Sequence, residues 1–173
     1  MKGKIDRSAL VIKPEWCDQI FDHGKVWEIR DKRCNKRGRF AIACSGTGTL
    51  VGEATMVDCL RVGRIDQDTG TLVPYSNKKE DCELFIGRPD NFPKHRISDP
   101  SDCDIIKTYS TVYAWVMCDA VRYAAPKPYV HTRGAQGWVR LDHDEASRDA
   151  LKRRRRSSCS DGTVSWKRRR RGP

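Results

Sequence analysis

The sequence has no long hydrophobic run. Its mean hydropathy is −0.72, and seven of its first 20 residues are charged. A membrane-spanning helix needs about 20 consecutive apolar residues, and a secretory signal peptide needs an uninterrupted apolar segment near its start. Neither pattern is present, so we expect a soluble intracellular protein that does not bind membranes. A length of 173 residues is typical of one domain with at most a small appendage.

Closely spaced cysteines are also absent. The chain has eight cysteines, and no two of them lie closer than ten positions. The common zinc sites use pairs of ligands only a few residues apart, so we expect no metal site and no cofactor. Because nothing marks the chain as secreted, we expect the cysteines to be mostly reduced thiols with a structural role.

Acidic residues are scarce only near the C-terminus. The whole chain has a net charge of +11, and residues 152–173 contribute +9 of it, from ten basic residues and one aspartate. Residues 1–151 hold 24 basic and 22 acidic residues and are therefore nearly neutral. A highly charged segment with few apolar residues cannot form a core. We predict a folded domain over residues 1–151 and a disordered basic tail over residues 152–173.

The tail contains two basic clusters separated by ten residues. The clusters consist of Lys152, Arg153, Arg154, Arg155 and Arg156, then Lys167, Arg168, Arg169, Arg170 and Arg171. This spacing resembles a bipartite nuclear localisation signal, which binds a nuclear import receptor. The alternative is an arm that binds RNA or DNA non-specifically by releasing counterions, and the two roles are compatible. We expect a nuclear protein if the host is eukaryotic and a cytoplasmic one otherwise.

Short β-rich segments dominate the rest of the chain. Their apolar patterns predict strands over residues 8–12, 25–30, 39–44, 49–60, 111–121 and 137–141. A helix is predicted from Pro14 to just before Gly24, because proline is favoured in the first turn of a helix and glycine just after the last. The pattern of residues 61–110 predicts a long irregular insertion with a short helix near residues 79–86. Asp142 is a candidate N-terminal cap for a final helix. The pattern is typical of an α+β fold with a small β-barrel and flanking helices.

One segment near the N-terminus resembles a known family. Residues 13–30 follow the pattern K-P…G-K-x-x-E-x-R and resemble the opening of the ASCH domain, a family of PUA-like β-barrels. Three later stretches resemble the same family in the same order: residues 45–54, 113–116 and 128–139. The resemblance implies a PUA-like barrel with one cleft, whose ligand is RNA or a modified nucleotide. A shared fold does not by itself establish catalysis.

The same segment supplies the main candidate ligand contacts. Glu28 and Arg30 are two positions apart on a predicted strand, so they share a face, and Lys25 follows the glycine that ends the helix. Arg30 can bind phosphate through its planar guanidinium, Lys25 offers a point charge, and Glu28 can accept hydrogen bonds from a base or ribose. The alternative is a Glu28–Arg30 ion pair that only stabilises the strand.

Four further residues complete the predicted ligand site. Lys13 opens the segment that resembles the family, and Ser45 and Thr47 lie in a Ser-Gly-Thr-Gly turn whose backbone amides can approach an anion. Tyr113 is a candidate for stacking on a base, whereas most of the five tryptophans are expected in the core. The full set of predicted RNA or nucleotide contacts is Lys13, Lys25, Glu28, Arg30, Ser45, Thr47 and Tyr113.

The sequence does not decide whether the protein is an enzyme. The candidate catalytic residues are Lys25 and Glu28. The resemblance includes amidohydrolases that deacetylate N4-acetylcytidine with a lysine and a threonine three residues later. Here Glu28 stands at the threonine position, which argues against that reaction. The resemblance also includes a branch associated with ribonuclease activity, for which Lys25, Glu28 and His131 are the available acid–base groups. We favour an RNA- or nucleotide-binding module; the alternatives are a hydrolase acting on RNA or a modified nucleoside, and a coactivator-like protein-interaction module.

Overall fold

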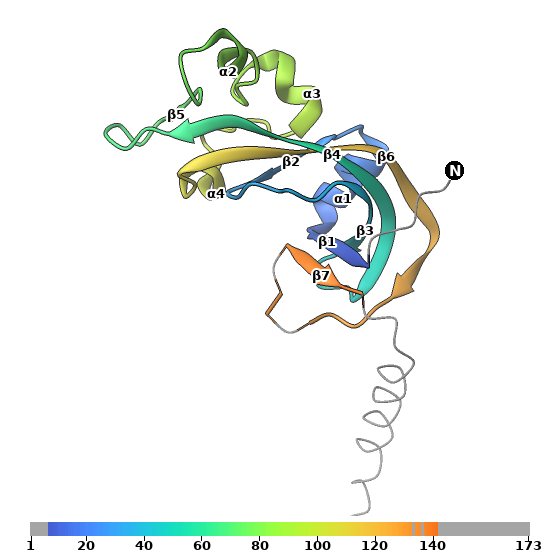
Figure 1. Cartoon of the computed structure of the whole chain (residues 1–173). Coiled ribbons are helices and arrows are strands. Elements are labelled where there is room, and N and C mark those ends of the chain that lie inside the picture. Colours follow the sequence, from blue (N-terminus) through green and yellow to red (C-terminus); the bar gives the residue numbers. More distant parts are fainter. Residues whose placement is uncertain (1–6, 133, 136, 142–173) are drawn as a thin grey trace, which may run out of the picture. The chain divides into compact units, whose positions relative to one another are not determined.

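The computed structural model describes residues 7–132, 134–135 and 137–141, which belong to one compact unit (Figure 1). The predicted domain boundary at residue 151, the helix predicted after Asp142 and the predicted disordered tail with its ten basic residues lie outside the described residues. Within the described part of the chain, no helix is long and apolar enough to cross a membrane.

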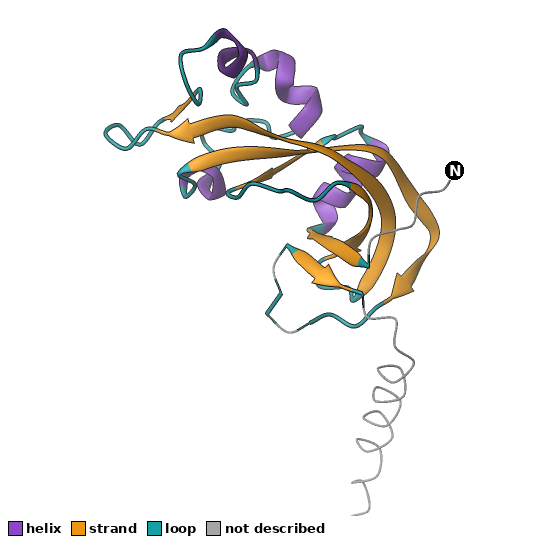
Figure 2. Ribbon diagram, in the orientation of Figure 1, coloured by secondary structure: helices purple, strands orange, loops and turns teal. Residues whose placement is uncertain are grey.

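The unit is built around one strongly curved β-sheet (Figure 1, Figure 2). The strands are β1 (Ser8–Ile12), β2 (Trp27–Arg30), β3 (Gly38–Cys44), β4 (Thr49–Ile65), β5 (Leu72–Val73), β6 (Thr111–Pro128) and β7 (Trp138–Arg140). Their order across the sheet is β2-β6-β4-β3-β1-β7, and β5 pairs with the end of β4. Only β1 and β3 run parallel; the other neighbouring strands are antiparallel.

The N-terminal strand and the following helix form as the sequence predicts. Strand β1 lies between β3 and β7 and is almost entirely buried, which explains why its residues are nearly all apolar. Helix α1 (Pro14–Asp22) begins with proline and ends before Gly24, whose φ of +70° is the left-handed conformation that glycine adopts easily. Its buried residues, Cys17 and Ile20, pack into the core.

Two main hydrophobic clusters hold the sheet in its curved shape. The first lies inside the curve and includes Leu10, Phe40 and Met56. The second lies between the far ends of β4 and β6 and the segment that joins them, from which Ile86 and Ile106 are fully buried. This connecting segment contains the short helices α2 (Lys79–Glu83), α3 (Phe92–His95) and α4 (Asp104–Lys107), with a 3-10 turn at Pro89–Asn91.

Strands β4 and β6 are longer than the sequence predicts. The prediction ended them at residues 60 and 121, whereas they extend to Ile65 and Pro128. Several irregularities in the β4–β6 register, including one between Leu50 and Gly52, allow the pair to bend round the core. Such bulges interrupt the simple alternation of apolar and polar residues, so alternation alone under-predicts the strand lengths.

Candidate functional site

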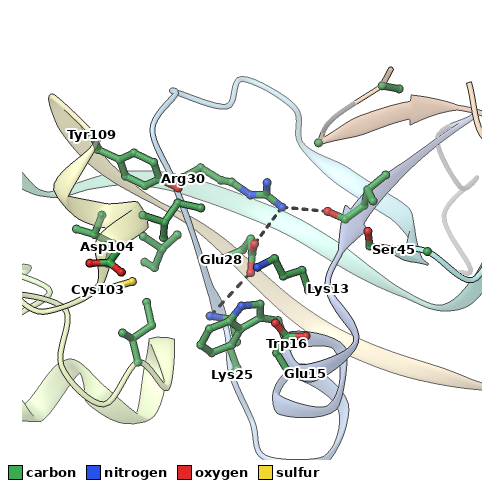
Figure 3. Close-up of a pocket in the computed structure, with 18 of the residues that line it drawn as sticks. Lys13, Glu15, Trp16, Lys25, Glu28, Arg30, Ser45, Cys103, Asp104 and Tyr109 are labelled. Atoms are coloured by element: carbon green, nitrogen blue, oxygen red, sulfur yellow. Dashed lines mark hydrogen bonds and ion pairs between the residues drawn. The ribbon is translucent and has the colours of Figure 1, made fainter. Parts of the chain in front are cut away.

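A cavity of about 850 Å³ opens between α1, β2, the turn after β3, α4 and four residues before β7, namely Tyr129, His131, Ala135 and Gly137 (Figure 3). Its volume lies within the range typical of small-molecule sites. The fold brings five of the seven predicted ligand contacts to this cavity: Lys13, Lys25, Glu28, Arg30 and Ser45. These residues come from three separate elements, so the cavity exists only in the folded unit.

The carboxylate of Glu28 on β2 links two cations, Arg30 on the same strand and Lys25 just before it. Its Oε1 atom lies 3.0 Å from Nη2 of Arg30, and its Oε2 atom lies 3.8 Å from Nζ of Lys25 (Figure 3). The same guanidinium nitrogen donates a hydrogen bond of 3.0 Å to the carbonyl of Val11 on β1. Because both carboxylate oxygens face a cation, Glu28 is better arranged to orient these two side chains than to accept a proton during catalysis.

The amine of Lys25 is buried at the base of the cavity. Only 3% of the residue is exposed, and its Nζ donates a 2.7 Å hydrogen bond to the carbonyl of His95 on α3. The amine also lies 4.7 Å from the centre of a Trp16 ring. Burial lowers the pKa of Lys25 from 10.5 to about 8; Glu28 opposes this shift and Arg30 adds to it. The amine therefore changes its charge close to physiological pH.

Arg30 is held over the core and retains free donor capacity. Strand β2 pairs with β6 so that Arg30 lies opposite Tyr113, and its guanidinium lies 5.6 Å from the centre of the Trp115 ring. About a quarter of the side chain is exposed, and its buried Nε atom has no hydrogen-bond partner among the described residues. An anion that enters the cavity can reach this arginine without breaking its contact with Glu28.

Thr47 and Tyr113 are not among the residues that line the cavity. The Thr47 hydroxyl donates to the carbonyl of Cys44 and contacts the hydroxyl of Thr49, so it stabilises the turn. Tyr113 packs against the first hydrophobic cluster. The glycines on either side of Thr47, Gly46 and Gly48, do line the cavity, and both have positive φ angles of +79° and +67°.

Part of the cavity wall comes from residues that the sequence analysis did not propose. Cys103 and Asp104 at α4 and Tyr109 after it line the side opposite Ser45 (Figure 3). Helix α4 has only four residues, too few to show the periodicity that reveals an amphipathic helix. The last wall includes Tyr129 and His131, of which His131 is among the acid–base groups that the sequence suggested. The Tyr129 hydroxyl and the His131 Nδ1 atom lie 2.8 Å apart.

The cavity has differently charged ends rather than one uniform potential. Arg30 and the Ser45–Gly48 turn offer donors at one end, whereas Asp104 offers a carboxylate at the other, near Tyr109 (Figure 3). Such a site suits a ligand that has both an anionic group and hydrogen-bond donors. The described residues include no group of three or more histidine, cysteine or acidic side chains that could hold a metal ion.

No protein-family model matches this chain, and no curated protein matches it in sequence. Solved structures do match it in three dimensions. The ASCH protein of Zymomonas mobilis is 13% identical to this chain, with a TM-score of 0.56 over 83% of this chain and 93% of the other. A tyrosine-to-phenylalanine variant of that protein is also 13% identical, with a TM-score of 0.56 over 83% of this chain and 96% of the variant. A serine-to-alanine variant is 13% identical as well, with a TM-score of 0.54 over 86% of this chain and 99% of the variant.

At this level of identity the similarity concerns the fold. The chain has the ASCH-like, PUA-like α+β fold, a mixed sheet with a few short helices. The structural match thus confirms, for the fold, the resemblance identified from residues 13–30 and the later stretches.

Proposed function

We propose that this protein is an RNA-binding module of the ASCH type and that its cavity holds one nucleotide of RNA or a modified nucleotide. The observation that carries the proposal is the arrangement of Arg30, the Ser45–Gly48 turn and Asp104 around one cavity of about 850 Å³. A nucleotide combines an anionic phosphate with a base whose amino and imino groups donate hydrogen bonds. The two ends of the cavity match these two parts.

In this proposal the phosphate binds beside Arg30. Its guanidinium is already oriented by Glu28 and Val11, so little conformational freedom is lost when it binds an anion. Lys13, exposed at the start of α1, adds a second positive charge at the cavity. In the turn at the same end, the N–H groups of Ser45 and Thr47 already donate to the carbonyls of Ile12 and Cys44. The amides that can approach the anion are therefore those of Gly46 and Gly48.

The base lies toward α4 in this arrangement. Tyr109 and Trp16 line the cavity, and an aromatic ring that stacks on a base contributes about 1–3 kcal/mol. The carboxylate of Asp104 is exposed and can accept a hydrogen bond from the base edge. Asp104 is the residue that would distinguish bases with an amino or imino donor from those without one.

The basic tail is the second part of the proposal. We propose that residues 152–173 add non-specific affinity for nucleic acid and, in a eukaryotic host, direct the protein to the nucleus through an import receptor. The support is the sequence itself, in which two clusters of five basic residues are separated by ten residues. Specificity for a particular nucleotide would then come from the cavity, because charge alone does not read a base.

The test compares cavity variants with matched surface variants in the full-length protein. Arg30→Met should weaken binding of a short single-stranded RNA by about tenfold or more, since hydrogen bonds between charged groups contribute about 1.5–3 kcal/mol. Lys13→Gln should weaken it by a few-fold. The controls are Arg64→Met and Lys79→Gln, which remove cations that do not line the cavity. Fluorescence anisotropy measures the affinities, and equal losses in the cavity and control variants would contradict the proposal.

Hydrolysis is a second candidate, and one observation favours it. The buried Lys25 amine has a pKa of about 8, which suits a group that exchanges a proton near neutral pH. Glu28 keeps this amine within 3.8 Å. If the protein cleaves RNA or a modified nucleoside, Lys25→Met should abolish turnover while Arg30→Met raises the KM. Complete absence of turnover in the wild-type protein would leave the binding function alone.

A further inference from the structure

A second cavity, of about 460 Å³, adjoins the first. Ile97 lines both cavities, and Phe92 and His95 of α3 line the second one. The walls of the second cavity are mainly apolar and include Ile86, Pro89, Phe92 and Pro100, with Ser98 at its exposed rim. None of the functions considered so far uses this space.

The ring of His95 lines the second cavity, and one of its two nitrogens has no hydrogen-bond partner among the described residues. The residue is 1% exposed. Its Nδ1 accepts a hydrogen bond of 3.0 Å from the backbone N–H of Ile97, so in the neutral ring the proton lies on Nε2. That Nε2 makes no hydrogen bond to any described residue, although the nearby Ile86 carbonyl slightly favours the protonated ring. A buried donor without an acceptor is costly, and a ligand acceptor would relieve it.

An aromatic ring stands next to this donor. Phe92 is 40% exposed although it is large and apolar, and its ring meets the His95 ring edge to face, with 6.0 Å between the ring centres. The exposed ring of Phe92 offers a flat apolar surface, and the perpendicular His95 ring offers a single donor. A flat heteroaromatic group with a carbonyl or ring-nitrogen acceptor, such as a nucleobase, complements both features.

Two cations beside His95 lack an acidic partner among the described residues. Lys94 donates to the side-chain oxygen of Asn91 at 2.8 Å, and Arg96 donates to the carbonyl of His23 at 2.5 Å. Both acceptors are neutral, so the positive charges remain uncompensated. A polyanion that passes across α3 would meet both charges, whereas a neutral peptide would not.

We propose that the second cavity binds the base of an adjacent nucleotide, so that the ligand is a single-stranded RNA segment of at least two nucleotides. The inference rests on the proposed function of the first cavity. One nucleotide occupies the cavity at Arg30, the backbone crosses α3 beside Lys94 and Arg96, and the next base enters between Phe92 and Ser98 to accept a hydrogen bond from His95 Nε2.

The experiment measures how affinity depends on ligand length. Full-length protein is titrated with the four ribonucleoside 5′-monophosphates and with the four 5′-phosphorylated homodinucleotides, using calorimetry. The best dinucleotide should bind about 5- to 150-fold more tightly than its monophosphate, the ratio expected for one additional stacked base. In labelled protein, the NMR signal of His95 Nε2 should shift with the dinucleotide and not with the monophosphate.

Two variants locate the second base. Ser98→Trp fills the cavity from its exposed rim, and Phe92→Ala removes the exposed ring; each should lower the dinucleotide affinity to that of the monophosphate and leave monophosphate binding unchanged. Ser101→Trp, an exposed serine of the same segment that lines neither cavity, should change neither affinity. Monophosphate binding without any gain from the second nucleotide, or a gain that survives Ser98→Trp, would overturn this inference alone. Absence of binding by every ribonucleotide would overturn the proposed function with it.

Discussion

The environment of the Lys25 amine predicts that the proposed anion binding depends on pH. With a pKa of about 8, the amine is mainly protonated at pH 7 and mainly neutral at pH 9. Because the protonated amine attracts the phosphate, the affinity for adenosine 5′-monophosphate should be highest below pH 8. It should fall as the pH rises above the pKa of about 8. Calorimetry between pH 7 and pH 9.5 checks this expectation. The dependence should disappear in Lys25→Met, and a flat profile in the wild-type protein would contradict it.

His95 makes the folded protein sensitive to acid. Burial is the main reason that its pKa is lowered from 6.5 to about 4, and the charge on Lys25 adds to the effect. Between pH 6.5 and pH 4 the unfolded chain binds the proton and the folded chain does not, so the free energy of unfolding falls as the pH falls. This group alone should account for about 3 kcal/mol.

Urea denaturation at several pH values tests the role of His95. The acid-dependent loss of stability between pH 6.5 and pH 4 should be smaller in His95→Gln than in the wild-type protein, because the glutamine does not titrate. The same pH dependence in both proteins would show that the histidine is protonated equally in the folded and unfolded states.

Individual residues of the site differ in how far the sequence could predict them. Lys25, Glu28 and Arg30 lie within one short segment, where the turn at Gly24 and the period of a strand place them on the same wall. The carbonyl of His95 reaches Lys25 from 70 positions away, and no local pattern predicts such a contact. Tyr113 has the expected position on β6, but it packs against the first hydrophobic cluster and does not line the cavity.

Among the elements, α1 is fixed to β4 by a glycine that leaves no room for a side chain. A Cβ atom at Gly52 would lie 2.4 Å from the ring of Phe21 and 2.5 Å from the backbone carbonyl of Val121. Gly52→Ala should therefore lower the free energy of unfolding by about 3 kcal/mol or more, since the strand β6 as well as the ring must move. Urea denaturation measures the loss.

Gly46→Ala is the matched control for this prediction. Gly46 has open space around it but a φ of +79°, so the change should cost only the strain of the left-handed backbone, about 1–2 kcal/mol. In a Phe21→Ala background the cost of Gly52→Ala should shrink but persist, because the Val121 carbonyl remains. Equal losses for the two glycine variants would argue against close packing at Gly52.

Elements with a clear local signal are those that the sequence predicts best. Helix α1 has proline at its start and glycine after its end, and β1 is a short apolar run between polar residues. The segment from residue 66 to residue 110 is different, because its helices have only four or five residues each. These helices are stabilised by burying single side chains such as Ile86 and Ile106 against the sheet, and tertiary packing of this kind leaves no periodic pattern in the sequence.

For the whole molecule, salt should separate the contribution of the tail from that of the cavity. Each phosphate contact to a single strand changes log K by about −0.7 per tenfold change in salt. When the ten lysines and arginines of the tail (residues 152–173) are replaced by glutamine, the slope of log K against log salt for a long RNA should become much smaller between about 50 and 200 mM salt. Binding that depends on Arg30 should remain. An unchanged slope would mean that the tail does not contact the RNA.

The strand order also has a consequence for protein synthesis. Strand β1, made first, pairs with β7, the last strand of the unit, through the neighbours Ala9–Val139 and Leu10–Trp138. The sheet therefore cannot be completed until about residue 140 has left the ribosome, and the wall that includes Tyr129 and His131 joins the cavity only then. Pairing over such a long stretch of chain favours slow folding. If the cavity holds a nucleotide as proposed, the nascent protein should be unable to bind it until translation of this unit has ended.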